Sequence, residues 1–482
     1  MSDAARPGSL PGLTGSSVRE LEQLLASRVV SAVDVCLAFI ERINRLNPAI
    51  NALVRFDAES ALSQARQADV RREKGETHGL LGIPYTVKDN IWVAGEVCTQ
   101  GSTLFRDFRA SHDAYAVARL REAGAVFLGF TNCSEFACKG VTTNPLFGTT
   151  RNPWNTDMTP GGSSGGAASA VAAGLCPLAL GTDAGGSTRR PAAHTGVVGL
   201  KPTMGLIPHP TGFAEPVFGH SVIGTMVRQV ADLYPVLAQL AVACGDDPLS
   251  NPRLQLPSFT PASDSVARLK IGYSPDLGLG GPVEPDVAAS VRAALDRLAR
   301  NGHEVIALDP DWPEGAAEEA LMPLQLAGLA TLYGEAWQRR EWDADPDIAA
   351  QIENGMRLKG SDVTQALYLR DALYRSMMAY FSRVDVLVTP TTPVTAWPCQ
   401  QLGPPTIAGR PVTSRAHAVF TPIFNHTGMP AISVPCGLDD AQLPIGLQIV
   451  GPRYSDAMLI ALAEEVERDA GFAWRARQLA GA

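Results

Sequence analysis

The chain lacks long apolar runs, long charge runs and internal repeats, and each absence excludes a class of protein. No apolar run reaches the ~18 residues that a membrane-spanning helix needs, so we predict no membrane partner. No block of five like charges and no basic tail occurs, and the net charge is −9, so we predict no nucleic-acid partner. No segment recurs with the period of about 20 to 50 residues that marks a solenoid or a propeller.

Cysteine is also scarce, with 8 residues scattered through a chain of 482. No two of them form a C-x-x-C pair, and the closest two are Cys133 and Cys138. This spacing provides neither a zinc-ligand set nor a disulfide framework, so we expect reduced thiols and no metal site. Residues 1–15 lack the charged-then-apolar pattern of a signal peptide, and we therefore expect a cytoplasmic protein.

What the chain does contain is the composition of a large folded protein, with 45% hydrophobic and 18% charged residues. Helical periodicity and strand-like apolar runs alternate along it. Helices are expected at 17–46 (two, the second ending at Asn47-Pro48), 57–73, 113–123, 167–175, 226–244, 287–300, 316–378 and 456–469, and strands at 51–56, 126–130, 177–180, 195–201, 269–273, 304–308, 384–389, 431–434 and 445–450.

Such alternation predicts an α/β fold. We expect a single large domain over residues 1–482, in which helices cover both faces of a central, twisted, mixed and mostly parallel sheet. Its expected parts are N-terminal helices (17–74), a catalytic core (80–245), a strand–helix–strand and helical substrate-side region (269–380) and a C-terminal completion of the sheet (384–470).

Two glycine-rich loops stand close together in the middle of the chain. Residues 161–166 read GGSSGG and residues 181–187 read GTDAGGS, with an alanine-rich segment and an apolar run between them. A flexible linker would be polar throughout, so a linker is not favoured. Free N–H groups in glycine loops bind anions, and each loop also carries a hydroxyl: Ser163 or Ser164, then Ser187. This pairing suits a site that stabilises an oxyanion beside a nucleophile.

A serine nucleophile needs a base, and Lys88 is a candidate at the end of the apolar run 80–90. Lysine is more often a solvated surface charge, but burial would lower its pKa from ~10.4 and suit it to proton transfer. His194 is the histidine nearest to Ser187, and we expect it to be a packed residue rather than a base. No G-x-S-x-G elbow and no phosphate-binding loop occurs. A second serine could relay a proton between Lys88 and Ser187, as in Ser–Lys variants of the triad.

Several long motifs resemble those of the amidase signature family, and the resemblance covers nearly the whole chain. They are GIPYTVKDN (82–90), TPGGSSGG (159–166), GTDAGGSTRRPAAHTGVVGLKPT (181–203), MPAISVPCG (429–437) and LPIGLQIVGPRYSD (443–456). The resemblance implies the amidase signature fold and hydrolysis of a linear amide through an acyl-enzyme, with no metal and no organic cofactor. Because members of the family are often dimers, it also makes a homodimer possible.

The resemblance assigns a role to each matching residue. It implies that Ser187 is the nucleophile, that Lys88 is the base, and that Ser163 bridges them after a cis peptide bond from Gly162. Residues implied to form the oxyanion hole are Ala184, Gly185, Gly186 and Ser187, and those implied to support the triad are Gly162, Ser164, Thr182, Asp183 and Arg189. We expect Gly161, Gly162, Thr131, Asn132 and Cys133 to bind substrate, in a pocket lined by 131–147, 204–220 and helices from 316–378.

Some positions depart from the family's usual residues, among them Arg190, His194, Ser221 and Thr225. They leave the pocket and the substrate open, and a carbamate, urea-type or ester carbonyl would suit the same machinery. A second alternative is the amidase-fold subunit of glutamine-dependent tRNA amidotransferase. That subunit is expected to carry an aspartate seven residues before Asn425, where this chain has Ala418, so this alternative is not favoured.

Overall fold

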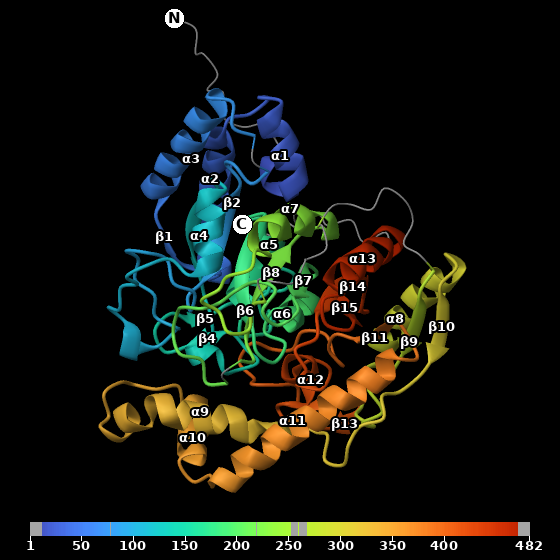
Figure 1. Cartoon of the computed structure of the whole chain (residues 1–482). Coiled ribbons are helices and arrows are strands. Elements are labelled where there is room, and N and C mark those ends of the chain that lie inside the picture. The colour runs from blue at the N-terminus through green and yellow to red at the C-terminus, as the bar shows by residue number, and fades with distance from the viewer. Residues whose placement is uncertain (1–11, 78, 218, 252–258, 260–267, 471–482) are drawn as a thin grey trace, which may run out of the picture.

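A large mixed sheet runs through the middle of the molecule, with helices on both of its sides (Figure 1). The computed structural model describes residues 12–77, 79–217, 219–251, 259 and 268–470, and of Glu318 the backbone alone. Among these residues the sheet has 11 strands in the order β1-β3-β2-β6-β8-β7-β14-β15-β11-β9-β10. They are β1 (Leu53–Phe56), β2 (Pro84–Lys88), β3 (Val126–Thr131), β6 (Leu178–Asp183), β7 (Val198–Lys201), β8 (Val222–Val227), β9 (Lys270–Tyr273), β10 (Glu304–Ala307), β11 (Val386–Pro390), β14 (Ala431–Leu438) and β15 (Pro444–Val450).

The helices that pack around this sheet begin at clear signals in the sequence. Ser17 and Ser31 each form a capping box at the start of a helix, which satisfies backbone N–H groups of its first turn. The helices are α1 (Val18–Ala26), α2 (Ala32–Ile50), α3 (Ala58–Glu73), α4 (Tyr115–Glu122), α5 (Gly165–Ala172), α6 (Arg189–Thr195), α7 (Leu233–Leu240), α8 (Pro285–Arg300), α9 (Glu318–Gln338), α10 (Pro346–Gly355), α11 (Gly360–Phe381), α12 (Pro422–His426) and α13 (Asp456–Ala470). Two small ladders, β4 (Thr143–Asn144) with β5 (Gly148–Thr149) and β12 (Thr406–Ile407) with β13 (Arg410–Pro411), lie outside the main sheet.

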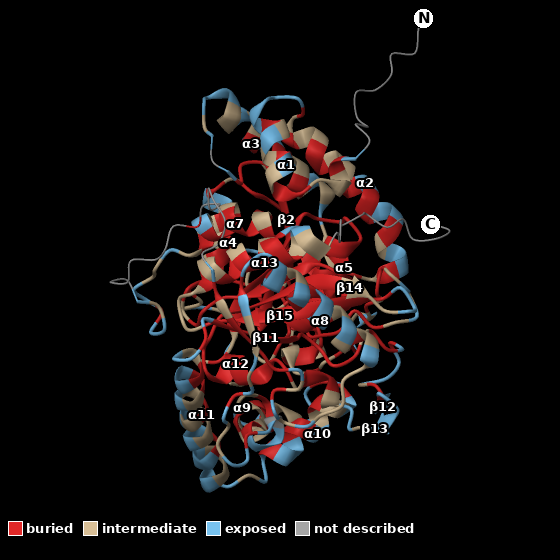
Figure 2. Cartoon of the chain, turned by 90° about the vertical axis from the view of Figure 1, so that its right-hand side faces the viewer, coloured by how far each residue is buried: buried red, intermediate tan, exposed pale blue. Residues whose placement is uncertain are grey.

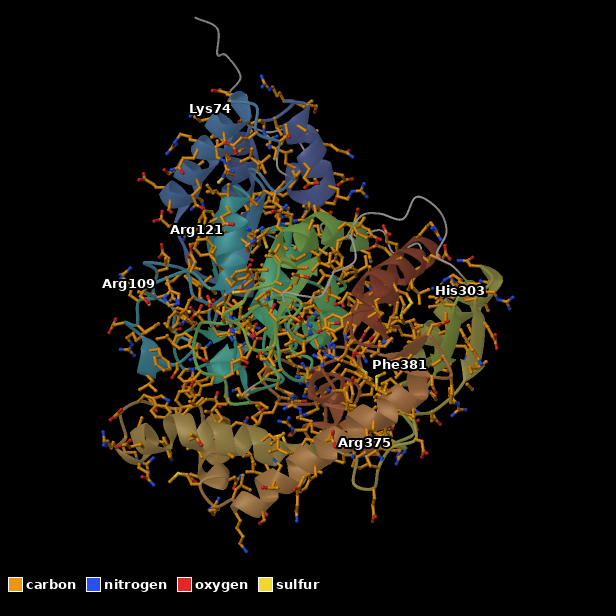
Figure 3. The ribbon with its side chains drawn as sticks, in the orientation of Figure 1. Lys74, Arg109, Arg121, His303, Arg375 and Phe381 are labelled. Carbon is orange, nitrogen blue, oxygen red and sulfur yellow. The ribbon has the colours of Figure 1, made fainter. Side chains whose placement is uncertain are left out.

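The central strands are buried from end to end. Every residue of β2, β3, β6, β7, β8, β11 and β15 is buried, and Figure 2 shows buried residues in the middle of the molecule and exposed ones on the helices around it. Strands covered on both faces read as continuous apolar runs rather than alternating ones. Charged side chains such as Lys74, Arg109 and Arg121 project from the periphery (Figure 3).

The fold class is confirmed as a single α/β domain, but the sheet is not mostly parallel. Of its neighbouring strand pairs among the described residues, four are parallel and six are antiparallel. Five of the antiparallel pairs run consecutively from β6 to β11, and the sixth joins the edge strand β1 to β3. The parallel pairs of this described sheet lie on its two flanks.

Three local predictions were wrong near the glycine loops. Residues 222–227 form strand β8 rather than leading into a helix, and α7 begins only at Leu233. Residues 189–195 form the unpredicted helix α6, whose Pro191 lies in the first turn, where a missing N–H costs no helical bond. Strand β6 does not end at Leu180 but continues to Asp183, because Gly181 and Asp183 still pair with β8.

Helix α2 also differs from its predicted end. It passes through Pro48 and ends at Ile50, followed by Asn51 in the left-handed conformation. Because Pro48 has no N–H, the last turn of α2 lacks one helical hydrogen bond. The Asn47 side chain then accepts hydrogen bonds from the backbone of Ala52 and Leu53, which turns the chain into β1.

The sheet brings the ends of two parallel neighbours together. Strands β2 and β6 are parallel neighbours, with Val87 opposite Leu180. Their last residues, Lys88 and Asp183, therefore lie at the same edge of the sheet. Helices α9, α10 and α11 lie together across one end of the molecule (lower part of Figure 1), facing that edge. The site therefore forms between the sheet edge and this helical layer.

Candidate active site

Lys88 is the last residue of β2, and its side chain is fully buried, as its sequence context predicts. Its Nζ donates one hydrogen bond to Ser163 Oγ and one to Thr182 Oγ1, each 2.8 Å long. Burial lowers the pKa of Lys88 to about 8, because a low-dielectric surrounding disfavours the ammonium form. Near neutral pH a fraction of the lysine is therefore unprotonated and able to accept a proton.

The GGSSGG segment turns sharply ahead of α5. The peptide bond between Gly162 and Ser163 is cis, as the family resemblance predicts. Gly161 has a φ of +79°, and a Cβ on Gly162 would lie 2.6 Å from the Val141 carbonyl carbon. Both positions therefore require glycine. The Thr142 hydroxyl holds the turn by donating a 2.9 Å hydrogen bond to the Gly161 carbonyl.

The second loop, residues 184–187, follows directly on β6. The Gly186 N–H donates a 2.7 Å hydrogen bond to Asp183 Oδ1, so one of the four predicted oxyanion donors is already engaged. Among the described residues, none accepts a hydrogen bond from the amides of Ala184, Gly185 or Ser187. The Ser164 N–H donates to the Ser187 carbonyl over 3.3 Å, which ties the two loops together.

Arg189 and Asp183 form a buried ion pair beneath this loop. Arg189 Nε and Nη2 donate to the two oxygens of the carboxylate over 3.0 and 2.9 Å, and its remaining N–H groups reach Asn425 and Gln448. Burial alone would raise the pKa of Asp183, but the charge and hydrogen bonds of Arg189 outweigh it and hold that pKa well below its ordinary value. Asp183 therefore stays ionised and can order the loop through the amides of Gly186 and Thr188.

Ser187 lies where two cavities meet, with 5% of its surface exposed. Ser163 borders the second of these cavities together with Ser187. In the described structure no hydrogen bond links the two hydroxyls, so the geometry joins Lys88 directly to Ser163 and leaves Ser187 as the neighbour across the cavity.

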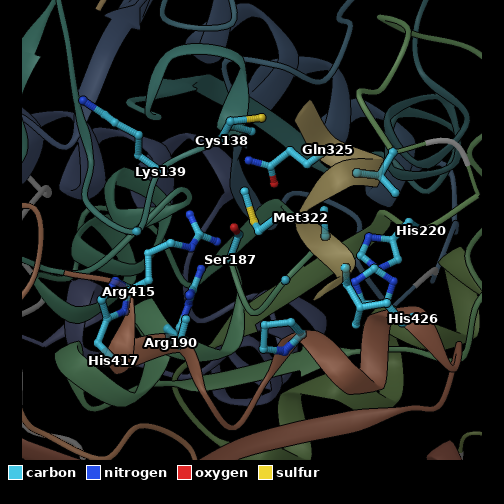
Figure 4. Close-up of a pocket in the computed structure, with 18 residues that line it drawn as sticks. Cys138, Lys139, Ser187, Arg190, His220, Met322, Gln325, Arg415, His417 and His426 are labelled. Carbon is cyan, nitrogen blue, oxygen red and sulfur yellow. The ribbon is translucent and has the colours of Figure 1, made fainter. Parts of the chain in front are cut away.

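The first cavity, of about 630 Å³, is bordered by polar and basic side chains (Figure 4). They come from the loop at 137–140, from α6, from α9 and from the chain just before and within α12. The lining residues that Figure 4 labels are Cys138, Lys139, Ser187, Arg190, His220, Met322, Gln325, Arg415, His417 and His426.

The second cavity, of about 550 Å³, is more aromatic and is bordered by Phe136 and Phe213. Phe136 and the next residue, Ala137, have φ values of +50° and +61°, a conformation that bulky residues rarely adopt. Phe136 is held there by stacking on Tyr333 of α9, with ring centroids 3.9 Å apart. The strained segment thus places Phe136 against the second cavity and Ala137 against both.

The residues predicted to bind substrate do not border these cavities of the described structure. Gly161, Gly162, Thr131, Asn132 and Cys133 are absent from both linings, and the residues from Phe136 to Gly140 take their place. The Asn132 amide is used internally, because its Nδ2 donates to Thr150 Oγ1 and its Oδ1 accepts from Asn144 Nδ2.

Two residues of the cavities, Glu215 and Gln325, lie within the pocket segments 204–220 and 316–378 that the sequence predicts. Arg415 also borders the first cavity together with Ser187, but it lies outside every predicted segment, and no local motif marks it. Arg190 was noted in the sequence as a departure from the apolar residue that is common in the family. The structure places it in the lining of the first cavity.

His194 is a packed residue, as predicted. It is buried with its ring edge-on to Trp397 at 5.2 Å, and burial, with the nearby Arg190 charge, lowers its pKa to about 3. Within the described part of the chain, no group of three or more His, Cys, Asp or Glu residues is arranged to hold a metal ion. No described helix combines the length and the apolar character that crossing a bilayer requires.

Known proteins match this chain along almost all of its length. A family model described as Amidase matches residues 34–460. The chain is 36% identical over 454 residues to an acylamidase of Rhodococcus erythropolis, covering 94% of each. It is 34% identical over 489 residues to a subunit of the glutamyl-tRNA(Gln) amidotransferase of Azoarcus sp. (strain BH72), covering 95% of this chain and 98% of that one. Among solved structures, 6-aminohexanoate cyclic dimer hydrolase is similar with a TM-score of 0.86 and 28% identity, covering 97% of this chain and 99% of the other.

Proposed function

The chain belongs to the amidase signature family, and on that premise we propose that it hydrolyses a linear amide through an acyl-enzyme formed on Ser187. That it is a hydrolase of carbon–nitrogen bonds follows from the family and from its acylamidase and dimer-hydrolase neighbours. The observation that carries the finer proposal is the 2.8 Å hydrogen bond from buried Lys88 to Ser163, beside a cavity that Ser187 shares.

In the proposed chemistry a proton is relayed from Ser187 through Ser163 to Lys88. The Ser187 oxygen attacks the amide carbonyl while its proton passes to Ser163, and Ser163 passes its own proton to the unprotonated amine of Lys88. The amides of Ala184, Gly185 and Ser187 have no acceptor within the described part of the chain, so they are available to stabilise the oxyanion, and each such donor is worth ~2.7–4 kcal/mol of barrier. The proton returns to the nitrogen as the C–N bond breaks, which releases the amine. Water then attacks the ester by the same route and releases the acid.

The relatives also include amidotransferase subunits, and one position speaks against that role for this chain. A glutamine-binding aspartate is expected seven residues before Asn425, but Ala418 lies there and borders the first cavity. A methyl group cannot bind the amino group of glutamine. The relation to those subunits therefore supports the shared acyl-transfer machinery rather than their substrate.

The test is amide turnover by the wild-type chain and by Ser187→Ala. We expect release of amine from simple aryl and alkyl amides by the wild type, and a loss of at least about 10⁴-fold in kcat for the variant, because the nucleophile is missing. Ser361→Ala, which removes an exposed hydroxyl of α11, is the matched control and should retain the activity.

The nucleophile can be identified independently of the substrate. Mass spectrometry after treatment with a fluorophosphonate should place the label on Ser187. A label on another serine, or equal turnover by wild type and Ser187→Ala, would contradict the proposal. Running amide, carbamate and ester substrates side by side decides which carbonyl the site prefers.

A further inference from the structure

The second cavity, which Ser187 and Ser163 share, has a single carboxylate among the described residues of its lining. This is Glu215, from the chain between β7 and β8, and no described lysine or arginine borders the cavity with it. Its polar neighbours are the Ser221 side chain, which forms a hydrogen bond with it, and His209, whose Nε2 lies 3.6 Å from Glu215 Oε1. A hydroxyl is neutral and an imidazole is cationic only while it is protonated, so a positive ligand would still find a carboxylate to pair with.

Glu215 stands at the end of the second cavity that lies away from the nucleophile. With His209 it also borders a third cavity, of about 970 Å³, whose described lining does not include Ser187. The other carboxylate of that third cavity, Asp247, accepts hydrogen bonds from the backbone N–H groups of His209 and Leu249. Asp247 is therefore engaged in holding the loop itself, which leaves Glu215 as the carboxylate that can meet a ligand.

Two aromatic rings border the second cavity together with this carboxylate. Phe213 lies two residues before Glu215, and Phe136 belongs to the strained segment that stacks on α9. Phe105, outside the lining, packs against both, with ring centroids 5.0 Å from Phe213 and 6.3 Å from Phe136. An aromatic face attracts a cation, and a carboxylate pairs with one through charge-assisted hydrogen bonds. This surrounding therefore favours a cationic group over an anionic one.

We propose that the substrate is an amide that carries an ammonium group several bonds from the scissile carbonyl, and that Glu215 and the rings of Phe136 and Phe213 bind this group. This inference rests on the proposed amide hydrolysis. The separation follows from the placement of the two ends: Ser187 lies where the first and second cavities meet, and Glu215 lies where the second and third meet. The ammonium group belongs either to the acyl half, as in an ω-amino acid amide, or to the amine half, as in a monoacylated diamine.

Lys88 determines the pH at which this binding is best measured. Burial lowers the pKa of Lys88 to about 8, whereas an alkylammonium group keeps its proton up to about pH 10.4. At about pH 9 the base is therefore mostly unprotonated while the substrate is still cationic. Burial raises the pKa of Glu215, but an ammonium group beside it favours the ionised carboxylate.

Two pairs of matched substrates separate the two halves of the amide. Comparing δ-aminovaleranilide with hexananilide tests an ammonium group on the acyl half, and comparing N-benzoylputrescine with N-pentylbenzamide tests one on the amine half. Within each pair a methyl group replaces the ammonium group. In at least one pair we expect kcat/KM to be about 10- to 100-fold higher for the ammonium member, as a charge-assisted hydrogen bond provides.

Variants then test whether Glu215 is responsible. Glu215→Gln removes the charge and keeps the size of the side chain. It should lower the ratio of the two kcat/KM values at least about tenfold, mainly through the KM of the ammonium member, and this ratio cancels any general effect on catalysis. Glu215→Asp keeps the charge and should keep part of the preference. Glu304→Gln removes an exposed carboxylate of the edge strand β10 and is the matched control, with no change expected.

A wild-type ratio at or below one in both pairs would overturn the inference while leaving amide hydrolysis intact. So would an unchanged ratio in Glu215→Gln. Binding to the Ser187→Ala protein, measured by calorimetry, keeps the two proposals separate because it needs no turnover. Tighter binding of an ammonium member, lost when Glu215→Gln is added, supports the site even where neither member is hydrolysed, and equal binding of both members overturns it.

Discussion

Lys88 is the residue whose chemistry sets the expected pH dependence of the enzyme. Its amine is buried at the end of β2 and bonded to two hydroxyls, and burial lowers its pKa to about 8. Only the unprotonated amine can accept a proton from Ser163. We expect kcat/KM to fall about tenfold for each pH unit below about 8 and to level off above it.

The measurement is the pH profile of kcat/KM for a neutral amide, since such a substrate does not itself titrate. Lys88→Met should be inactive across the range. A profile that instead bends near 6.5 would point to a histidine as the base, which the neutral and packed state of His194 argues against.

The roles and surroundings of the motif residues could largely be predicted one residue at a time. For the pocket, only the segments that line it could be predicted, not the individual residues. The burial of Lys88, the cis bond before Ser163 and the packed state of His194 followed from local sequence or from the resemblance. Asn132 was predicted to bind substrate, and in the structure its side chain forms hydrogen bonds with Gly148 and Asn144 of a neighbouring loop. A polar amide suits a ligand and such a loop alike. Only the fold decides between those uses.

At the scale of elements, strand β8 shows why the prediction of local structure failed near the site. The run VIGTMV has the apolar content of a strand and of a buried helix alike, and periodicity cannot separate the two. What decides is its position between β6 and β7, which satisfies its backbone on both sides. Gly224, in the middle of this strand, then packs directly against Thr188 of the nucleophile loop.

A substitution at Gly224 should therefore affect stability and catalysis together. A Cβ there would lie 2.1 Å from Thr188 Oγ1, and the strand keeps an ordinary φ, so the clash is with the side chain and not with the backbone conformation. We expect Gly224→Ala to lower the free energy of unfolding by about 1–3 kcal/mol and to reduce kcat by displacing Ser187.

Urea denaturation and steady-state kinetics on the same preparations measure both effects. Gly281→Ala, with no atom of the described residues within 4 Å of the added Cβ, is the matched control and should be nearly neutral. Combining Gly224→Ala with Thr188→Ala should recover more than about 0.5 kcal/mol relative to additivity. Wild-type kcat in Gly224→Ala would show that the β8 contact does not position the nucleophile.

At the scale of the whole molecule, the sheet order explains what the sequence could not reveal. Residues 82–90, 159–166 and 181–203 carry motifs long enough to read, whereas Arg415 lies outside every predicted pocket segment and borders the Ser187 cavity only through tertiary packing. The mixed sheet likewise depends on which strands become neighbours: β6 pairs with β8, and β7 pairs with β14, although neither partner is the next strand along the chain. The predicted dimer and cytoplasmic location stay predictions.

Two groups of buried ionisable residues lie in different parts of the fold and respond to pH with opposite signs. Beside the cavity are His194, His220, His417 and His426, whose pKa values burial lowers, to about 3 for His194 and for His426. Where α1, α13 and the turn at 230–232 meet, burial raises the pKa of Glu22 to about 7 and of Glu467 to about 8. Each group titrates differently in the folded and unfolded chain, so each links local stability to pH.

The signs follow from which state binds more protons. Below pH ~6.5 the unfolded histidines are protonated and the folded ones are not, so stability near the cavity falls as the pH drops from ~6.5 toward 3. Above pH ~4.5 the unfolded glutamates are ionised while the folded ones stay protonated up to about 7 or 8. Stability around α1 and α13 therefore falls as the pH rises through that window.

Hydrogen exchange followed by mass spectrometry at pH 5.5, 7 and 8.5, corrected for intrinsic rates, resolves the two regions. From pH 7 to 5.5 we expect α6 and α12 to lose protection, by about 1 kcal/mol for each histidine that an opening exposes. From pH 7 to 8.5 we expect α1 and α13 to lose protection instead. Glu467→Gln should abolish most of the alkaline loss without altering the acid one, because it removes the titrating carboxyl and keeps an acceptor for the Val230 amide. Parallel loss in both regions on either side of neutrality would mean that one global unfolding event, and not these two groups, controls exchange.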